Sequence, residues 1–379
     1  MWTRIRGSWV GLGLGCVLLA GCRSDVVQPH EGADGPGVIA HGFRVPGAIA
    51  VIGDQEFLLA ERSGTLHHFK DGGLTAIAGV PRSRMSDVWG GLLDVSLHPD
   101  FAVNRQVYLA YTDRDYGLAV ARFTLRDGQA ENAEVIHESD EFSIGSRIEW
   151  QDSDRFFLSH GIGGDPYPMV GSQVLDADVG KIHRLTADGG IPVDNPVLPG
   201  KSAPSTVWSY GHRNPQGLYF DSDEGRLFAV EHGPMGGDEL NVVDAGGNYG
   251  WPLFSYGLNY DGSAVSTMTA VEASAVSTLP VAHWGPDFRV APSGLLRIRE
   301  DGTSNDDGSF LLGALNLQHL LRYEPTTDET TIVLRGVGRV RDVAALPDGG
   351  FLISVDAGSP TPAMTGRVIR LLPGARLPS

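Results

Sequence analysis

The sequence predicts an all-β protein, and more specifically a six-bladed β-propeller. Beyond residue 36, no long stretch has the 3.6-residue apolar period of a helix. Short runs of alternating apolar residues are separated instead by Asp-Gly, Gly-Gly and Pro-Asp turns, the pattern of half-buried strands. A weak strand-turn-strand unit recurs six times, and six such blades close into one ring. The alternative is a pair of β-sandwiches.

The six copies follow one another along the whole chain after residue 36. Their starts are roughly 45–75 residues apart, near the period of propeller blades with insertions. In order, they contain AIAVIGDQEFLLAERSG from Ala48, GLLDVSLHPDF from Gly91, SRIEWQDSDRFFLSHG from Ser146, GLYFDSDEGRLFAVEHG from Gly217, GLLRIREDG from Gly294 and DVAALPDGGFLISVDAG from Asp342.

Two long connections interrupt the regular spacing. Around the third and fourth copies, residues 165–177 and 256–275 have the composition of loops. Because propellers and other rigid scaffolds carry their sites on loops, we expect these segments to form walls of a cleft.

The first residues have the features of a bacterial secretion signal. In residues 1–21, Arg4 and Arg6 precede an apolar run, residues 9–20, which is shorter than the roughly 18–20 residues that span a bilayer. The sequence LAGC ending at Cys22 matches a lipobox, so we expect Cys22 to be lipidated. The alternative is an ordinary signal peptide with an incidental cysteine.

These features predict an exported protein with four segments. After the signal, residues 22–36 are polar and Gly-rich and are expected to form a lipidated, flexible tether. The propeller is predicted for residues 37–374, and a tail for residues 375–379. Lipidation of Cys22 would attach the propeller to a membrane on its periplasmic or cell-surface face.

The net charge is strongly negative. The chain has 29 Lys and Arg against 46 Asp and Glu, giving −17. An acidic surface argues against nucleic acid as a partner, and against an electrostatic dock on anionic lipid, so the lipid anchor is the expected membrane link. The sequence also lacks the short motifs of zinc, nucleotide and serine-hydrolase sites.

Residues 210–252 contain the densest cluster of candidate functional side chains. Arg213 and Asn214 form a basic-plus-amide pair, and a guanidinium offers a rigid fork of donors for carboxylate or quinone oxygens. Pro215 favours an extended or turn conformation at the preceding residue, which places the pair on a loop at a strand edge.

The sequence EHGPMGGDELN follows shortly after that pair. Glu231, Asp238 and Glu239 supply carboxylate oxygens, and the turn at Gly233-Pro234 can direct backbone carbonyls toward one point. Carboxylates and carbonyls are the ligands that calcium takes, at about 2.3–2.6 Å.

The blocks YGHRNPQG, EHGPMGGDELN and NYGWP, in this order, resemble the glucose/sorbosone dehydrogenase family of soluble PQQ-dependent glucose dehydrogenases and aldose sugar dehydrogenases. The resemblance covers about residues 37–374. It implies that PQQ lies over the axial channel in contact with Arg213 and Asn214. It also implies that the carbonyls of Gly233 and Pro234 hold a calcium ion bound to the cofactor.

The resemblance implies further site residues. Glu239 and Tyr249 match a second calcium site of the aldose-dehydrogenase branch. Arg339 and Arg341 occupy the family's paired-arginine positions in GRVRDV. Residues two apart in a strand face the same side, so both can reach one anionic ligand. Trp284 resembles the aromatic residue that lines the sugar cleft, and the alternative is a core tryptophan.

Several functional positions differ from the family pattern. The general-base histidine of the third blade falls on Ser143, and an unaided hydroxyl is a poor base at neutral pH. Trp89 replaces a glutamine that contacts the cofactor, Asn316 replaces a lysine, and residues 161–163 read Gly-Ile-Gly in place of Gly-Asp. His160, close in sequence to the altered loop, is the candidate replacement base; the alternative is a packed or solvent-facing residue at a strand end.

Three functions follow from these residues. The first is oxidation of an aldose sugar or related alcohol with PQQ, calcium and an unidentified electron acceptor, its activity lowered or lost if nothing replaces the base. The second is a non-catalytic extracytoplasmic propeller that binds PQQ or another small anion. The third is a calcium-dependent hydrolase of the lactonase type. It ranks last because such a site needs several Asp, Asn or Glu side chains, and the motifs offer mainly backbone carbonyls.

Overall fold

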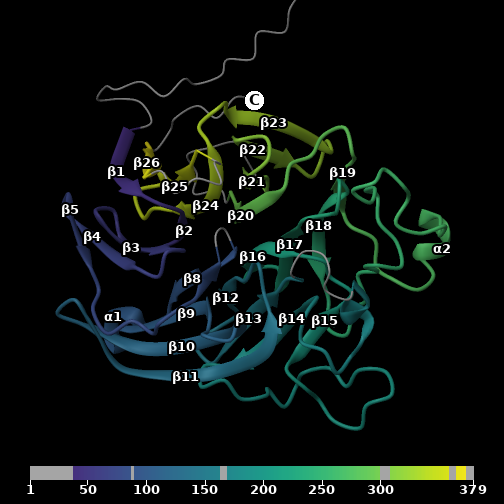
Figure 1. The fold of residues 1–379 in the computed structure, drawn as a ribbon, viewed down its shortest axis with the longest axis horizontal. Helices are drawn as coiled ribbons and strands as arrows, with labels where there is room; N and C mark the ends of the chain where they lie inside the picture. Colours follow the sequence, from purple (N-terminus) through teal and green to yellow (C-terminus); the bar gives the residue numbers. More distant parts are fainter. Residues whose placement is uncertain (1–36, 87–88, 163–168, 299–307, 358–363, 373–379) are drawn as a thin grey trace, which may run out of the picture.

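The computed structural model describes residues 37–86, 89–162, 169–298, 308–357 and 364–372. It contains six four-stranded antiparallel sheets arranged around a central axis (Figure 1). The prediction of a six-bladed β-propeller is therefore confirmed, and the β-sandwich pair is excluded. The signal segment, Cys22, the tether and the tail from residue 375 lie outside the described residues.

The blades follow the six predicted copies in order. The first three blades consist of β2 (Pro46–Gly53), β3 (Glu56–Glu61), β4 (Leu66–Lys70) and β5 (Gly73–Ala76); β8 (Leu92–Leu97), β9 (Gln106–Thr112), β10 (Gly117–Arg126) and β11 (Gln129–Phe142); and β12 (Ile148–Trp150), β13 (Arg155–His160), β14 (Lys181–Thr186) and β15 (Val207–Tyr210). The next two consist of β16 (Pro215–Asp221), β17 (Arg226–Glu231), β18 (Asp238–Val243) and β19 (Ala282–Trp284); and β20 (Pro292–Arg297), β21 (Phe310–Ala314), β22 (His319–Glu324) and β23 (Glu329–Leu334).

The sixth blade joins the two ends of the described chain. It contains β24 (Arg339–Ala345), β25 (Phe351–Asp356), β26 (Gly366–Leu371) and, as its outermost strand, β1 (Gly37–Phe43). β1 pairs antiparallel with β26. The innermost strands β2, β8, β12, β16, β20 and β24 contact one another in sequence, and β24 contacts β2 (Figure 1). The ring is thereby closed without a free inner edge.

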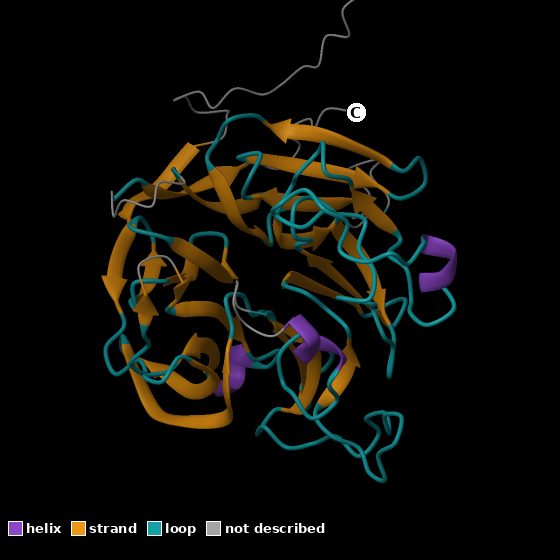
Figure 2. Cartoon of the chain, turned by 45° about the vertical axis from the view of Figure 1, so that its right-hand side comes forward, coloured by secondary structure: helices purple, strands orange, loops and turns teal. Residues whose placement is uncertain are grey.

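The remaining elements are short. A two-stranded ribbon, β6 (Met85–Ser86) and β7 (Trp89–Gly90), precedes the second blade. The helices are α1 (Phe101–Asn104), α2 (Ala270–Ala273) and the 3-10 helix Met169–Gln173 (Figure 2). The last two lie within the segments expected to be loops, so that expectation missed a helical turn in each. None of the helices in the described part of the chain is long and apolar enough to cross a membrane.

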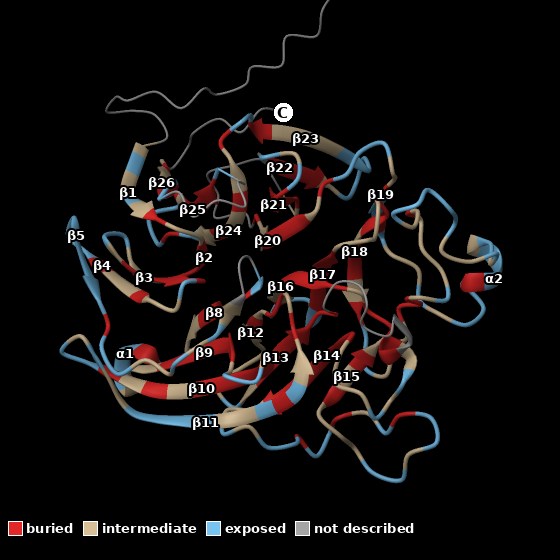
Figure 3. Cartoon of the chain, in the orientation of Figure 1, coloured by how far each residue is buried: buried red, intermediate tan, exposed pale blue. Residues whose placement is uncertain are grey.

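Apolar packing between blades explains the alternating sequence pattern. Six separate clusters of buried hydrophobic residues lie between neighbouring blades, one at each interface around the ring. The inner strands are mostly buried, whereas the outer strands β5 and β11 are largely exposed (Figure 3). Each blade thus covers the apolar face of the next, so both faces of every sheet are packed against a neighbouring sheet.

Glycines at the start of the inner strands allow this close approach. A Cβ on Gly217 would lie 2.2 Å from the Ser293 carbonyl oxygen of the next blade, and one on Gly294 would lie 2.6 Å from the Val343 nitrogen. These two contacts explain why the repeating unit begins with Gly-Leu in the fourth and fifth copies.

Arg147 connects four blades at the centre of the ring. Its Nη1 lies 3.1 Å from Asp94 of the second blade, and its Nη2 lies 3.2 Å from Asp342 of the sixth. Its Nε donates to the Gln216 carbonyl of the fourth blade, at 2.8 Å. The side chain lines a cavity of about 330 Å³, together with residues of all six inner strands.

Removing the Arg147 guanidinium should be strongly destabilising. Arg147→Met leaves the buried Asp94 and Asp342 carboxylates facing each other, and breaking a buried ion pair from one side costs about 3–5 kcal/mol. Arg126→Met, which removes an exposed pair to Glu131, should cost about 1 kcal/mol or less. Urea unfolding of both variants measures the difference, and equal midpoints would contradict the central role of Arg147.

Candidate functional site

The predicted site residues gather at one edge of the blades. In each antiparallel blade, the start of the inner strand and the end of the second strand share an edge. Arg213 and Asn214 precede β16, Gly233 follows β17, and Arg339 begins β24. Together with the other connections on this edge, they surround one opening of the central channel, here called the channel mouth.

Arg213 and Asn214 are held by several contacts. Arg213 Nη1 donates to the Gly233 carbonyl at 2.8 Å, and its guanidinium lies 5.2 Å from the centre of the Trp251 ring. Asn214 is buried, its Oδ1 accepts from Gln216 at 2.8 Å, and its Nδ2 lies 3.3 Å from His232 Nδ1. The predicted pair therefore forms a rigid donor surface.

Arg339 and Arg341 both approach Asp356 at the end of β25. Arg341 Nε donates to an Asp356 carboxylate oxygen, and Arg339 Nε lies 4.0 Å from the other. The two arginines thus face the same side, as the sequence predicts. Burial and the neighbouring Arg341 lower the pKa of Arg339.

The sequence interpretation missed Arg62, which follows β3 and also lies at the mouth. The signal was the repeat itself: Arg62 follows the acidic last residue of its strand in AERSG just as His232 does in VEHGP. Burial, then Arg341 and Arg147, lower the pKa of Arg62 to about 9, so it is still charged at neutral pH. Arg62 adds a further guanidinium to the mouth.

The pKa of His232 reflects the positive charge of the surrounding arginines. Its Nε2 donates to the Pro292 carbonyl at 2.8 Å, which leaves Nδ1 as an acceptor facing Asn214. Burial and the nearby Arg213, with smaller effects of Arg339 and Arg62, lower the pKa of His232 to about 3. The ring is therefore neutral at pH 7, and three guanidinium groups act on one imidazole.

The turn that was predicted to hold calcium is tightly folded. Gly233 N donates to Asp238 at 3.0 Å, and a Cβ on Gly233 would lie 2.1 Å from the Gly236 carbonyl oxygen. The Gly233 carbonyl accepts from Arg213, and a carbonyl has a second lone pair for a cation. The Gly233 carbonyl therefore retains one acceptor position for a hard cation while Arg213 occupies the other.

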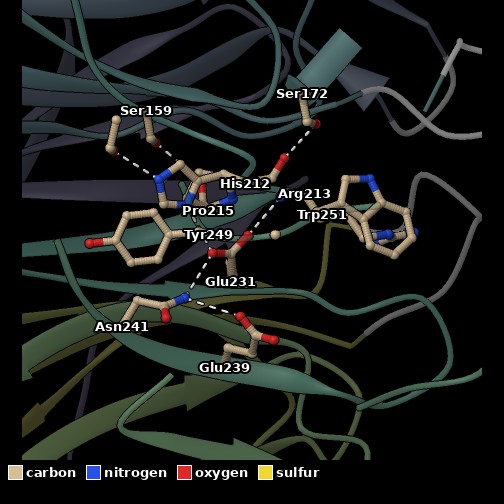
Figure 4. A network of polar contacts seen from close by, with 12 residues as sticks. Ser159, Ser172, His212, Arg213, Pro215, Glu231, Glu239, Asn241, Tyr249 and Trp251 are labelled. Atoms are coloured by element: carbon tan, nitrogen blue, oxygen red, sulfur yellow. Dashed lines mark hydrogen bonds and ion pairs between the residues drawn. The ribbon is translucent and has the colours of Figure 1, made fainter. Parts of the chain in front are cut away.

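Glu239 belongs to a buried network below this turn (Figure 4). Asn241 Nδ2 donates to Glu231 at 2.9 Å and to Glu239 at 3.1 Å, while Asn241 Oδ1 is buried without a donor. Burial and the adjacent Glu231 raise the pKa of Glu239 well above its usual range. Asn241 donates to both carboxylates through Nδ2, so its Oδ1 points away from them, and both Glu231 oxygens already accept hydrogen bonds; the three side chains do not form one calcium site as they stand. Across the described residues, no three His, Cys, Asp or Glu side chains are arranged to hold a metal.

The Tyr249 side chain is not available to that site. Its hydroxyl donates to the Val242 carbonyl at 2.6 Å and accepts from Asp244 N at 2.8 Å. Its ring stacks on His212, with centroids 4.5 Å apart. Tyr249 can therefore offer a metal only its backbone carbonyl, and its side chain stabilises the core beneath the network.

Ser143 and His160, the two candidate catalytic residues, are both completely buried. Ser143 Oγ donates to the Gly145 carbonyl at 2.6 Å. His160 Nε2 donates to the Glu141 carbonyl at 3.1 Å, and its ring lies 6.2 Å from that of His183. Burial and His183 lower the pKa of His160 to about 3. The structure does not support His160 as a replacement base, because its ring packs inside the protein.

Three further predicted residues lie in different surroundings. Trp284 belongs to the core between the fourth and fifth blades and donates to Thr330 at 2.9 Å, so it does not line a cleft and the alternative reading as a core tryptophan holds. Trp89 is 48% exposed on the rim. Asn316 is exposed and donates to the Arg289 carbonyl at 3.0 Å. Gly161 and Ile162 are buried, and residue 163 lies outside the described part.

The propeller and the motifs at its mouth define a class of sugar dehydrogenases. A sequence model described as Glucose / Sorbosone dehydrogenase matches residues 43–364, and the chain belongs to this family.

Individual relatives agree with this assignment. Aldose sugar dehydrogenase YliI of Escherichia coli is 34% identical over 336 residues, which cover 83% of this chain and 88% of that protein. A solved glucose dehydrogenase has a TM-score of 0.78 at 31% identity, covering 89% of this chain and 99% of that one. The PQQ-bound form of an aldose sugar dehydrogenase from Streptomyces coelicolor has a TM-score of 0.72 at 27% identity, covering 89% and 96%.

The buried histidines should make the fold acid-sensitive. The folded pKa values of His160 and His183 are lowered to about 3 and 4, so between these values and about 6.5 the unfolded chain binds more protons than the folded one. Stability should therefore fall as pH drops below about 6.5, by on the order of 1 kcal/mol per pH unit for each histidine.

His160→Leu tests this expectation. Between pH 6 and 4, the slope of the free energy of unfolding against pH should be smaller in the variant by the contribution of about one proton. This holds whatever the stability of the variant at pH 7. Urea unfolding at several pH values measures both slopes. Identical slopes in the variant and the parent protein would contradict the assignment.

Proposed function

We propose that the protein is a PQQ- and calcium-dependent dehydrogenase of an aldose sugar or a related alcohol. The observation that carries the proposal is the convergence of Arg62, Arg213, Arg339 and Arg341 on one channel mouth in a chain of net charge −17. Guanidinium groups bind carboxylates through paired hydrogen bonds, and PQQ is a tricarboxylate. Bound PQQ would supply the group that accepts hydride from the sugar.

The residues of the mouth divide into three roles in this proposal. Arg339 and Arg341 bind carboxylate groups, with Asp356 fixing their orientation. Arg213 and Asn214 donate to oxygens on the other side of the ligand. The carbonyls of Gly233 and Pro234 hold the calcium ion. Family membership and the PQQ-bound structure of the Streptomyces relative support this assignment.

A second candidate function is binding of PQQ or a similar anion without catalysis. The observation that favours it is the burial of both candidate bases, Ser143 and His160, with their polar atoms directed at backbone carbonyls. Loss of a positioned base costs about 10²–10⁴ in rate. Binding and turnover are therefore separable in this protein.

We also propose that the protein is exported and anchored by a lipid on Cys22. The proposal rests on the signal-like residues 1–21 and the lipobox, which lie outside the described residues. An unidentified electron acceptor would then be reached on the periplasmic or cell-surface side.

Titration of the purified protein with PQQ and calcium tests the function. Tight PQQ binding that requires calcium, with dye reduction on a panel of sugars, supports the dehydrogenase. PQQ binding without turnover on any sugar supports the binding protein. Absence of PQQ binding together with calcium-dependent cleavage of esters or lactones would replace both with the hydrolase.

Ser143→Ala should leave turnover close to that of the parent protein. The Ser143 hydroxyl is buried and already donates to Gly145, so it accepts no proton from a substrate. Steady-state kinetics with the best sugar of the panel checks this. A fall in kcat of about 10² or more would show that Ser143 acts in proton transfer after all.

A further inference from the structure

Arg62 is a buried charge with too few partners. It is 8% exposed, and its Nε has no hydrogen-bond partner. Its Nη1 and Nη2 lie 3.4 and 3.3 Å from the Ile144 carbonyl oxygen, at the long limit for such bonds. A guanidinium has five N–H donors, and a buried donor left unsatisfied costs about 1–3 kcal/mol. A side chain with only a structural role would find better acceptors.

The charges around Arg62 make its position costly. Arg341, Arg147 and Arg339 all act on it as like charges, and Asp356 is the carboxylate that opposes them. Arg147 is already engaged by Asp94 and Asp342. Arg62 of the first blade therefore lies near Asp356 together with Arg339 and Arg341 of the sixth blade, both of which approach that carboxylate. Such a cluster is stabilised when an anion enters it.

The backbone fixes Arg62 in place. Its N–H donates to the Val45 carbonyl at 3.0 Å, and a Cβ on Gly91 would lie 1.8 Å from the Arg62 carbonyl oxygen. Gly91 has a φ of 87°, which suits glycine. The Gly90-Gly91 turn after Trp89 thus packs directly on Arg62 and prevents its main chain from moving away from the mouth.

We propose that Arg62 is a ligand-binding residue that donates through its Nη–H groups to a carboxylate of a planar aromatic polycarboxylate at the channel mouth. The inference rests on the proposed function, of which it names an additional binding residue. The same carboxylate is shared with Arg339 or Arg341, which lie at the start of the inner strand of the adjacent sixth blade.

The test measures binding and stability together in the full-length protein. The variants are Arg62→Met, Arg62→Lys and, as a control of equal charge change, Arg289→Met, which removes an exposed arginine on the same edge. Calorimetry measures the affinity for PQQ in the presence of calcium, and for trimesate, a planar tricarboxylate without redox chemistry. Urea unfolding without ligand measures the intrinsic stability of each variant.

We expect Arg62→Met to weaken binding of PQQ by about 10- to 100-fold and to leave ligand-free stability unchanged or higher, because a like charge is removed. Arg62→Lys should bind with intermediate affinity, since it keeps the charge without the fork. Arg289→Met should match the parent protein. Equal PQQ affinity in parent and Arg62→Met overturns the proposal while leaving the dehydrogenase intact.

The two probes separate this inference from the function on which it rests. If the parent protein binds trimesate in an Arg62-dependent manner but does not bind PQQ, the cofactor is wrong and the anion-binding role of Arg62 stands. If Arg62→Met is destabilised without ligand and Arg62→Lys restores stability, Arg62 is a structural residue and the proposal fails. Binding of neither probe to the parent protein overturns both.

Discussion

The Arg147 guanidinium is the interaction on which the rest of the structure depends. A propeller holds its blades by apolar contacts between sheets, which fix spacing better than they fix the position of one strand along its neighbour. Arg147 adds directional bonds to Asp94, Asp342 and Gln216, so the second, third, fourth and sixth blades meet at one height on the axis. Asp94 and Asp342 in turn accept backbone N–H groups from the blade that follows each of them. The mouth residues lie at the ends of the strands that Arg147 joins, so the position of these strands also sets the position of the arginines.

The first and fourth blades bring a similar short sequence to the mouth, and the residue that follows its acid differs between them. Glu61 accepts the N–H of Arg44, and Glu231 accepts that of Arg213, two residues before the inner strand in both cases. The acid joins the end of the second strand to the start of the first. The next residue is then turned toward the axis: Arg62 in the first blade and His232 in the fourth. The acid that closes the blade and the side chain that faces the axis are thus consecutive residues. The second residue can therefore vary while the acid keeps the blade closed.

The sequence predicts most of the fold and part of the site. Periodicity and turn residues indicate the six blades, and the phase of the repeat places Arg213, Gly233 and Arg339 on one edge. The phase does not show whether a side chain at that edge points into the mouth or into the next blade. That choice depends on groups far away in the chain: the Arg62 guanidinium reaches Ile144, 82 residues on, and Trp284 reaches Thr330, 46 residues on. For this reason the sequence did not reveal Arg62 and left Trp284 open between the cleft and the core.

Anion binding and proton transfer at the mouth depend on different numbers of groups. The side chains proposed to bind the anion come from the first, fourth and sixth blades, and each charge-assisted hydrogen bond contributes only about 1.5–3 kcal/mol, so the loss of one leaves the others in place. A general base is one atom in one position, and its loss costs about 10²–10⁴ in rate, or roughly 3–5 kcal/mol of transition-state stabilisation. If Ser143 stands at the position of the base, as the family resemblance implies, this one substitution would lower turnover without disturbing the arginines. In the proposed function, recognition of the anion rests on these arginines, and turnover would require a proton acceptor that enters with the substrate or from solvent.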